Sequence, residues 1–276
     1  DKAMEGLVWD FTGKNMEFPA LGSNWPDNVC MVGIANPDFA AAHGRLIQSF
    51  PELKDLETRV MFDIPGILQA VSGPVEFMMV DTGDTGVQML VRATDRGNML
   101  YGLVAPMLSL VPGAELTMDS LTIKIPDMMK SKVPFETVML KKSTDTFMVM
   151  TQKDLDVAVA DRVAAGNTLA KNADFQRLTG GLPKSGSVFV YYAKDGQSKV
   201  TNWANPMAKT ESTYNEAMAS MISRQQDGLA TVTYSYAGVA EMQLRNAFGR
   251  LDEVLDQAGN SDLLPAAESE IEENLE

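Results

Sequence analysis

The chain has 276 residues, of which 45% are hydrophobic, and a formal net charge of −14 from 23 basic and 37 acidic side chains. This apolar content supports a substantial core, whereas so acidic a surface repels nucleic-acid phosphates and argues against nucleic-acid binding. No apolar run reaches the roughly 18–20 residues that cross a membrane, and a single cysteine excludes an intrachain disulfide. The sequence starts at Asp1 without a charged-then-apolar leader, so we expect a mature form from which any signal peptide or lipid anchor has been removed.

The first predicted unit is a strand followed by a helix. Residues 29–35, VCMVGIA, form an apolar run in which we expect Cys30 to be a small core residue rather than a nucleophile. NPD at 36–38 is typical of a helix start. The apolar stripe of the helix is Phe39, His43, Leu46, Ile47 and Phe50. Since His43 is the only histidine, a histidine-rich metal site is excluded, and we expect this side chain at the core edge, bonded to a backbone group.

Period-two alternation predicts the strands. The alternating segments are 87–93, 121–125, 135–151 and 240–246. Residues 135–151 predict a hairpin whose turn lies near Lys142–Asp145. DTGDTG at 81–86 predicts another hairpin turn, because a calcium loop would need further oxygen ligands at fixed spacing. One apolar and one more polar face per strand favours an antiparallel sheet with one side toward solvent.

Helical spacing of apolar residues alternates with these strands. The first of these helices is predicted from Leu100 to Val111, and we expect Pro106 to kink it or restart it. A further helix is predicted at 154–164. The last stripe is Tyr214, Ala217, Met218, Met221 and Ile222. We therefore predict an α+β fold, a mostly antiparallel curved sheet with helices packed on one face.

Residues 179–192, TGGLPKSGSVFVYY, raise the question of a phosphate-binding loop. Such a loop follows a strand and needs a lysine and a serine or threonine directly after its second glycine, whereas Ser187 and Val188 follow Gly186. The preceding residues, 169–181, instead predict a helix that closes on a glycine cap, and 187–193 predict a strand. We interpret the glycines as a structural joint.

The same joint carries a family resemblance. Its pattern is Leu169, Ala170, Phe175, Leu182, Pro183, Val190 and Tyr192. This run resembles a passage in a family of bacterial exported or lipid-anchored proteins of unknown function, and the similarity extends over roughly residues 60–250. The resemblance implies an envelope or exported location and two related halves. It implies no activity and brings no catalytic residues.

The order of predicted elements suggests an internal duplication. Residues 26–46 and 183–203 each read as turn, strand and helix, and residues 64–104 and 214–255 each read as helix, strand, strand and helix. Accordingly, the predicted organisation is 1–182 as N-terminal half, 183–260 as C-terminal half repeating part of its element order, and 261–276 as an acidic, disordered tail.

Methionine is the most unusual feature of the composition, with 19 residues. Met128 with Met129, or Met218 with Met221, could ligate copper(I) through their thioethers. Against this, Met148 and Met150 share a strand face and Met107 and Met218 lie on helical stripes, so packing in an adaptable core is the favoured interpretation. Such a core could also line a pocket for apolar ligands. The tryptophans Trp9, Trp25 and Trp203 are scattered and receive no role.

The favoured hypothesis for function is a non-enzymatic, exported, periplasmic binding or scaffold protein, whose partner is an apolar small molecule or another protein. We assign no catalytic, cofactor-binding or metal residue. A hydrolase built on scattered carboxylates is the first alternative, with Asp63, Asp81 and Asp84 as candidates. The second alternative is a cytoplasmic regulatory module.

Overall fold

The structure, a computed structural model, describes residues 10, 12–18, 20–57, 62–83, 85–130, 132–205, 216–225 and 229–235. They belong to one compact unit, Asp1–Tyr236. The predicted strand at 240–246, the helix expected after it, and the tail at 261–276 lie outside the described residues. None of the described helices has the length and apolar character needed to span a bilayer.

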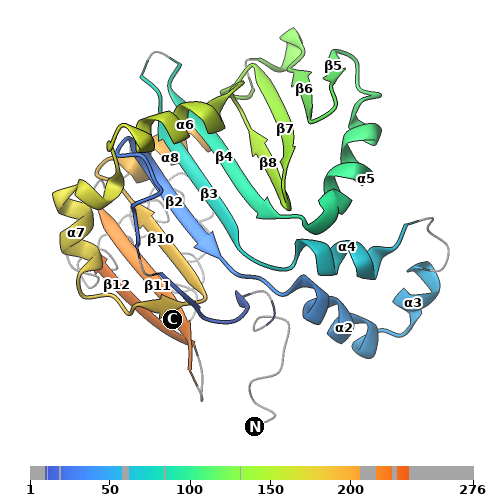
Figure 1. Ribbon diagram of the computed structural model, residues 1–276, viewed down its shortest axis with the longest axis horizontal. Coiled ribbons are helices and arrows are strands. Elements are labelled where there is room, and N and C mark those ends of the chain that lie inside the picture. The colour runs from blue at the N-terminus through green and yellow to red at the C-terminus, as the bar shows by residue number, and fades with distance from the viewer. Residues whose placement is uncertain are drawn as a thin grey trace, which may run out of the picture. The chain divides into compact units, whose positions relative to one another are not determined.

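A ten-stranded sheet with open edges dominates the fold (Figure 1). Its spatial order is β12-β11-β10-β2-β3-β4-β8-β7-β6-β5, and each neighbouring pair is antiparallel. The strands are β2 (Val29–Ala35), β3 (Val75–Asp81), β4 (Val87–Thr94), β5 (Ala114–Leu116), β6 (Ser120–Lys124), β7 (Thr137–Ser143), β8 (Thr146–Met150), β10 (Val188–Tyr192), β11 (Met218–Arg224) and β12 (Leu229–Ser235). Two short strands, β1 (Met16–Glu17) and β9 (Ser185–Gly186), pair separately. The predicted α+β class with a mostly antiparallel sheet is confirmed.

Seven helices accompany the sheet in the described part of the chain. They are α2 (Phe39–Ser49), α3 (Glu52–Glu57), α4 (Ile64–Val71), α5 (Met99–Leu108), α6 (Leu155–Ala164), α7 (Ala173–Thr179) and α8 (Gly196–Ala204), with 3-10 turns η2 (Arg96–Asn98), η3 (Asp127–Met129) and η4 (Leu169–Lys171). The predicted start of α2 is confirmed, since the Asp38 carboxylate accepts the Ala41 amide at 2.9 Å. Helix α5 continues through Pro106 to Leu108 without restarting.

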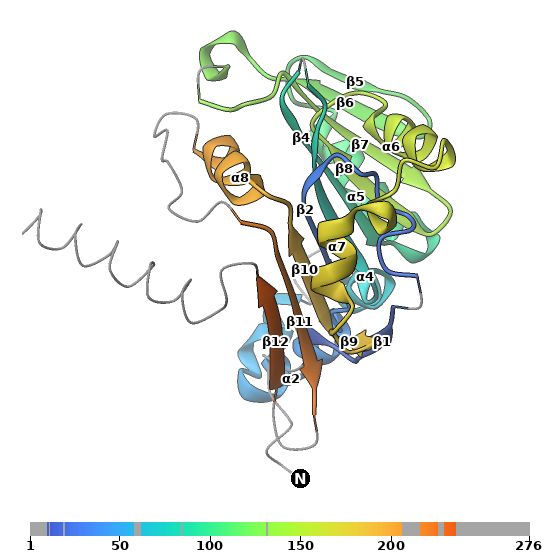
Figure 2. The same ribbon diagram turned by 90° about the vertical axis from the view of Figure 1, so that its left-hand side faces the viewer.

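Helices cover both faces of the sheet, so the predicted one-sided packing was incomplete. Consecutive residues of β7 point to opposite faces. Met139 packs in one cluster with Leu155 of α6, while Leu140 packs in another with Tyr101 of α5. Figure 2 shows α8 and α6 on opposite sides of the sheet. The cause lies in the central strands, which are buried on both faces, as the adjacent residues Met78 and Met79 illustrate at 0% and 1% exposure.

The larger core cluster is rich in aromatic rings. The rings of Trp25 and Phe189 stack with centroids 5.6 Å apart, and Phe175 meets Tyr191 edge-on at 5.0 Å. Leu169 and Leu182 are buried in the same cluster. Several residues that carry the family resemblance are therefore core residues. Packing explains their spacing, and no catalytic or binding role is needed to account for it.

Both predicted halves contribute to the ten-stranded sheet. β10 and β2 lie side by side as its third and fourth strands from the β12 edge, with β11 and β12 beyond β10, and β3 and β4 beyond β2. β2 is followed in the chain by helix α2, and β10 by helix α8. This symmetric order agrees with a strand, helix, strand, strand repeat, and the duplication itself stays a prediction.

One local prediction was wrong and another was confirmed. The stripe from Tyr214 to Ile222 is not a helix, because Met218–Arg224 form strand β11. Alternate residues from Ala217 to Ser223 are buried, a period of two that was hidden because both faces carry apolar side chains. The predicted glycine cap is confirmed, since Gly180 is the C-cap of α7, in a right-handed conformation with a φ of −60°. Helix α7 precedes the glycines and strand β10 follows them, the reverse of the order in a phosphate-binding loop.

Candidate functional site

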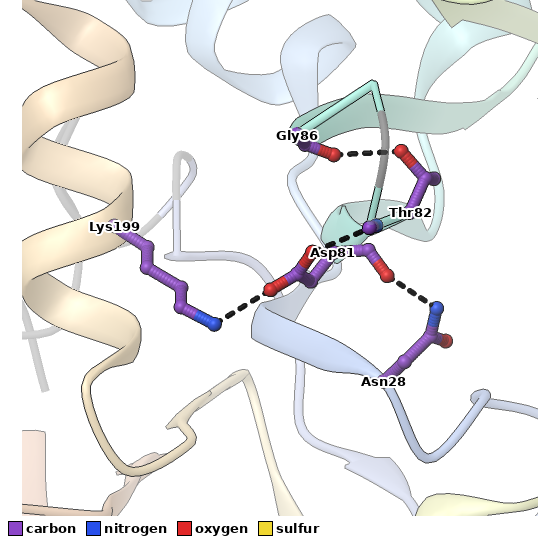
Figure 3. Close-up of polar contacts among 6 residues, drawn as sticks. Asn28, Asp81, Thr82, Gly86 and Lys199 are labelled. Atoms are coloured by element: carbon purple, nitrogen blue, oxygen red, sulfur yellow. Dashed lines mark hydrogen bonds and ion pairs between the residues drawn. The ribbon is translucent and has the colours of Figure 1, made fainter.

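The DTGDTG segment forms the predicted hairpin turn between β3 and β4 (Figure 3). The Thr82 amide donates to the Gly86 carbonyl at 3.0 Å. The Asp81 carboxylate accepts the Gly83 amide at 2.9 Å and the Lys199 ammonium of α8 at 2.6 Å. Asp84 lies outside the described residues. Within those that are described, no three histidine, cysteine or acidic side chains come together as a possible metal site.

The carboxylates suspected of catalysis have structural contacts. The hydrogen bond from Lys199, followed by that from the Gly83 amide, lowers the pKa of Asp81, and the same bond to Asp81 raises the pKa of Lys199. A carboxyl group with a lowered pKa is a weak general base near neutral pH. Asp63 begins helix α4 and accepts the Gly66 amide at 3.0 Å. The Asp81–Lys199 pair thus joins α8 to the turn, while Asp63 caps a different element.

We expect Asp81→Asn to lower the free energy of unfolding by up to about 1 kcal/mol, since both partners are partly exposed. Asp81 has a pKa below its usual 3.8, so its contribution is present above about pH 4 and is lost as the pH falls through the folded value. Lys199 has a pKa above 10.5, so its contribution is lost only as the pH rises beyond that. Urea unfolding at about pH 7 and about pH 2 measures the difference in the free energy of unfolding between the wild type and Asp81→Asn. This difference should vanish at the lower pH.

The matched control for this pair is Glu115→Gln. Glu115 pairs with Lys124 on the surface, both side chains being 65% exposed, and its loss should leave stability unchanged. Equal stability of wild type and Asp81→Asn at about pH 7 would show that the pair does not hold α8.

His43 and Cys30 lie apart on α2 and β2. His43 forms a hydrogen bond with the Glu57 carboxylate of α3, so the expected backbone partner was wrong. Cys30 is buried, as predicted, and burial raises the pKa of its thiol from 9.0 to about 11. A thiol with so high a pKa is a poor nucleophile, because the thiolate is the reactive form.

The methionines divide into buried and exposed groups. Met148 and Met150 are core residues, as predicted, but Met107 is 58% exposed, which contradicts its assignment to the core. Met218 and Met221 are three positions apart on β11 and point to opposite faces of the sheet, so they do not converge on one ion. Met128 is 81% exposed on η3.

An exposed apolar surface occurs where α5 leads into edge strand β5, and the sequence analysis missed it. We call it the α5–β5 surface; it consists of Met107, Leu110, Val111, Leu116 and Met118. Leu110 is 85% and Met118 is 86% exposed. Single exposed apolar side chains are ordinary, whereas contiguous groups of them are typical of interaction sites. Met118 could have indicated this surface from the sequence, because a methionine is unexpected in a polar hairpin turn such as the LTMDS segment.

A cavity of about 370 Å³ is lined by residues of α5, of the turn between β5 and β6, and of β7. Figure 1 shows these elements at the end of the sheet formed by β5. The lining of the cavity is Gly97, Asn98, Tyr101, Gly102, Ala105, Pro106, Leu116, Thr117, Met118 and Lys142. Tyr101 is 5% exposed, and its hydroxyl has no hydrogen-bond partner among the described residues. The same holds for Oδ1 of Asn98. The lining thus combines apolar side chains with unsatisfied polar atoms and one cation.

Comparison with known proteins gives no relative: no protein-family model, curated protein or solved structure matches this chain. The resemblance to exported bacterial proteins therefore stays a prediction.

Proposed function

We propose that this protein is a non-enzymatic binding protein of the bacterial cell envelope, and that its α5–β5 surface receives an apolar ligand or a protein partner. The observation that carries the proposal is the exposure of Leu110 and Met118 near a cavity whose lining is partly apolar. Exposed apolar surfaces are typical of binding sites in soluble proteins.

The energetics support a binding role for this surface. Burying an exposed leucine or methionine side chain contributes about 1.5–3 kcal/mol. Leu110, Leu116 and Met118 gain little of this in the free chain, since each is at least 50% exposed. A partner that covered all three would recover this free energy, less the cost of association.

The open edge of the sheet supplies a second attraction. β5 pairs with β6 on one side and is the last strand of the sheet. An unpaired strand edge presents backbone donors and acceptors and is a template for further pairing. The edge is short, with three residues, so apolar contact rather than backbone pairing would dominate the affinity.

The envelope location rests on the family resemblance alone. Expression of the full-length gene product in its own host, followed by separation of cytoplasm, periplasm and membranes, tests it. Recovery in the cytoplasm would favour the regulatory-module alternative.

We expect the double substitution Leu110→Ser and Met118→Ser to weaken the binding of an apolar fluorescent dye about tenfold, which corresponds to about 1.4 kcal/mol. Both side chains are exposed, so the melting temperature should not fall. A dye titration measures the change. Met128→Ser is the control, because Met128 is 81% exposed but lies on η3, outside this surface. Equal dye binding by the double variant and the wild type would refute the proposed surface.

A further inference from the structure

We infer that the cavity beside the α5–β5 surface binds the carboxylate end of an apolar molecule, with Lys142 as the cation and Tyr101 as the hydroxyl donor. The inference rests on the proposed function, because it assigns a ligand class to the same surface. Three features of the lining support it.

The first feature is the cation. The ammonium of Lys142 lies 5.6 Å from the centre of the Tyr101 ring, in the range of a cation–π contact. The nearest described carboxylate is Asp119, at 3.7 Å, and its side chain is 68% exposed. A pair so long and so exposed satisfies an ammonium poorly. Lys142 therefore keeps hydrogen-bond donors for a bound anion.

The second feature is the pair of orphaned polar atoms. Six buried side-chain atoms lack partners in the described part of the chain, and two of them, the Tyr101 hydroxyl and Asn98 Oδ1, belong to residues that line this cavity. Burying such groups without a partner is costly, and a ligand that bonds to them recovers the cost. Both atoms have almost no exposed area, so a ligand reaches them only if the cavity wall moves.

The third feature limits the charge of the head group. The N-terminal amides of α5 are already occupied, because the buried Asp95 carboxylate accepts from Leu100 at 2.8 Å and from Tyr101 at 2.9 Å. With one lysine in the lining and Asp119 close by, the site suits a single negative charge rather than a phosphate.

Apolar side chains complete the site. Ala105, Pro106, Leu116 and Met118 would contact the ligand's tail. The volume of about 370 Å³ lies near the lower end of ordinary ligand sites, about 300–1,000 Å³, so the tail is short.

Two sources supply this chemistry, a fatty acid and the C-terminus of an apolar peptide or acyl-amino acid. The two ligands differ in the hydrogen bond that they can make to Asn98, whose Oδ1 needs a donor. An amide N–H next to the carboxylate provides that donor, whereas a fatty acid has none.

Calorimetric titration with three probes tests the inference: decanoate, 1-decanol and N-octanoylglycine. We expect decanoate to bind at least tenfold more tightly than decanol. N-octanoylglycine should bind more tightly still if a peptide-like end is the natural ligand, and no more tightly than decanoate if it is a fatty acid. Lys142→Gln should abolish the preference for the carboxylate. Lys124→Gln is its control, since Lys124 is 65% exposed, pairs with Glu115 and does not line the cavity.

Tyr101→Phe separates binding from folding. It removes a hydroxyl that has no partner in the free protein, so the melting temperature should stay constant or rise while decanoate affinity falls severalfold. A lower melting temperature with unchanged affinity would show a structural role and overturn the assignment.

The outcomes distinguish this inference from the proposed function. If decanol and decanoate bind equally, and Lys142→Gln changes neither, the surface is apolar-binding but the carboxylate assignment is wrong. If none of the three probes binds and the substitutions at Leu110 and Met118 do not alter dye binding, both proposals are wrong.

Discussion

Phe189→Ala is expected to lower the free energy of unfolding by about 3–5 kcal/mol, the range for removing a fully buried phenylalanine. Phe189 is 0% exposed. Its ring contacts those of Trp25 at 5.6 Å, Phe18 at 6.2 Å and Phe175 at 6.4 Å. Because these neighbours come from separate segments, they cannot collapse together into the space that the ring leaves.

Urea unfolding at equilibrium measures this effect. The control is Phe50→Ala, whose side chain is 55% exposed, and its change should stay within about 0.5 kcal/mol. A loss below about 1 kcal/mol for Phe189→Ala would mean that the aromatic cluster does not form the core we describe.

Gly196→Ala is expected to cost about 2–3 kcal/mol through a steric clash at the start of α8. A Cβ at this position would stand 2.1 Å from the Cys30 carbonyl oxygen, and backbone cannot yield as a flexible side chain does. Helix α8 would have to withdraw from β2. That movement would also separate Lys199 from Asp81 and uncover the Cys30 thiol.

Two measurements follow this change. Urea unfolding reports the stability, and the rate of thiol labelling reports the exposure of Cys30, which should increase. The matched control is Gly44→Ala in α2, where no atom lies within 4 Å of the added Cβ; replacing a helical glycine there should stabilise the protein by about 0.5–1 kcal/mol. If Gly196→Ala folds as stably as the wild type with an unreactive Cys30, α8 does not pack as described.

Much of the fold could be predicted from local pattern. The hairpin over 135–151 alternates cleanly and contains β7 and β8, and the start of α2 at Asp38 follows from cap chemistry. The stripe from Tyr214 to Ile222 failed because alternation and helical spacing overlap when both faces of a strand are apolar. The prediction that Met107 is a core residue failed for a related reason. A helical stripe shows which residues share a face, but not how far a neighbouring layer covers that face.

The candidate site could not be predicted, because it depends on pairing between distant segments. Lys142 reaches the Tyr101 ring because β7 pairs antiparallel with β6, Ser120 standing opposite Lys141. That register is fixed by the packing of Leu121 and Leu140 against α5, and no local spacing encodes it. The sequence did provide Asp63, Asp81 and Asp84 as candidate carboxylates. Of the two that the structure describes, Asp63 caps a helix and Asp81 is an ion-pair partner.

The most direct test of the binding role is native mass spectrometry of the wild-type protein and of the variant with Leu110→Ser and Met118→Ser, both purified without detergent from the protein's own host. We predict that the wild type carries a stoichiometric bound mass, which solvent extraction releases if it is an apolar molecule and which dissociates as a protein subunit otherwise. The variant should be recovered at its bare mass. A wild-type protein at its bare mass, or a bound mass that both proteins retain equally, would contradict the assignment of the α5–β5 surface as the binding site.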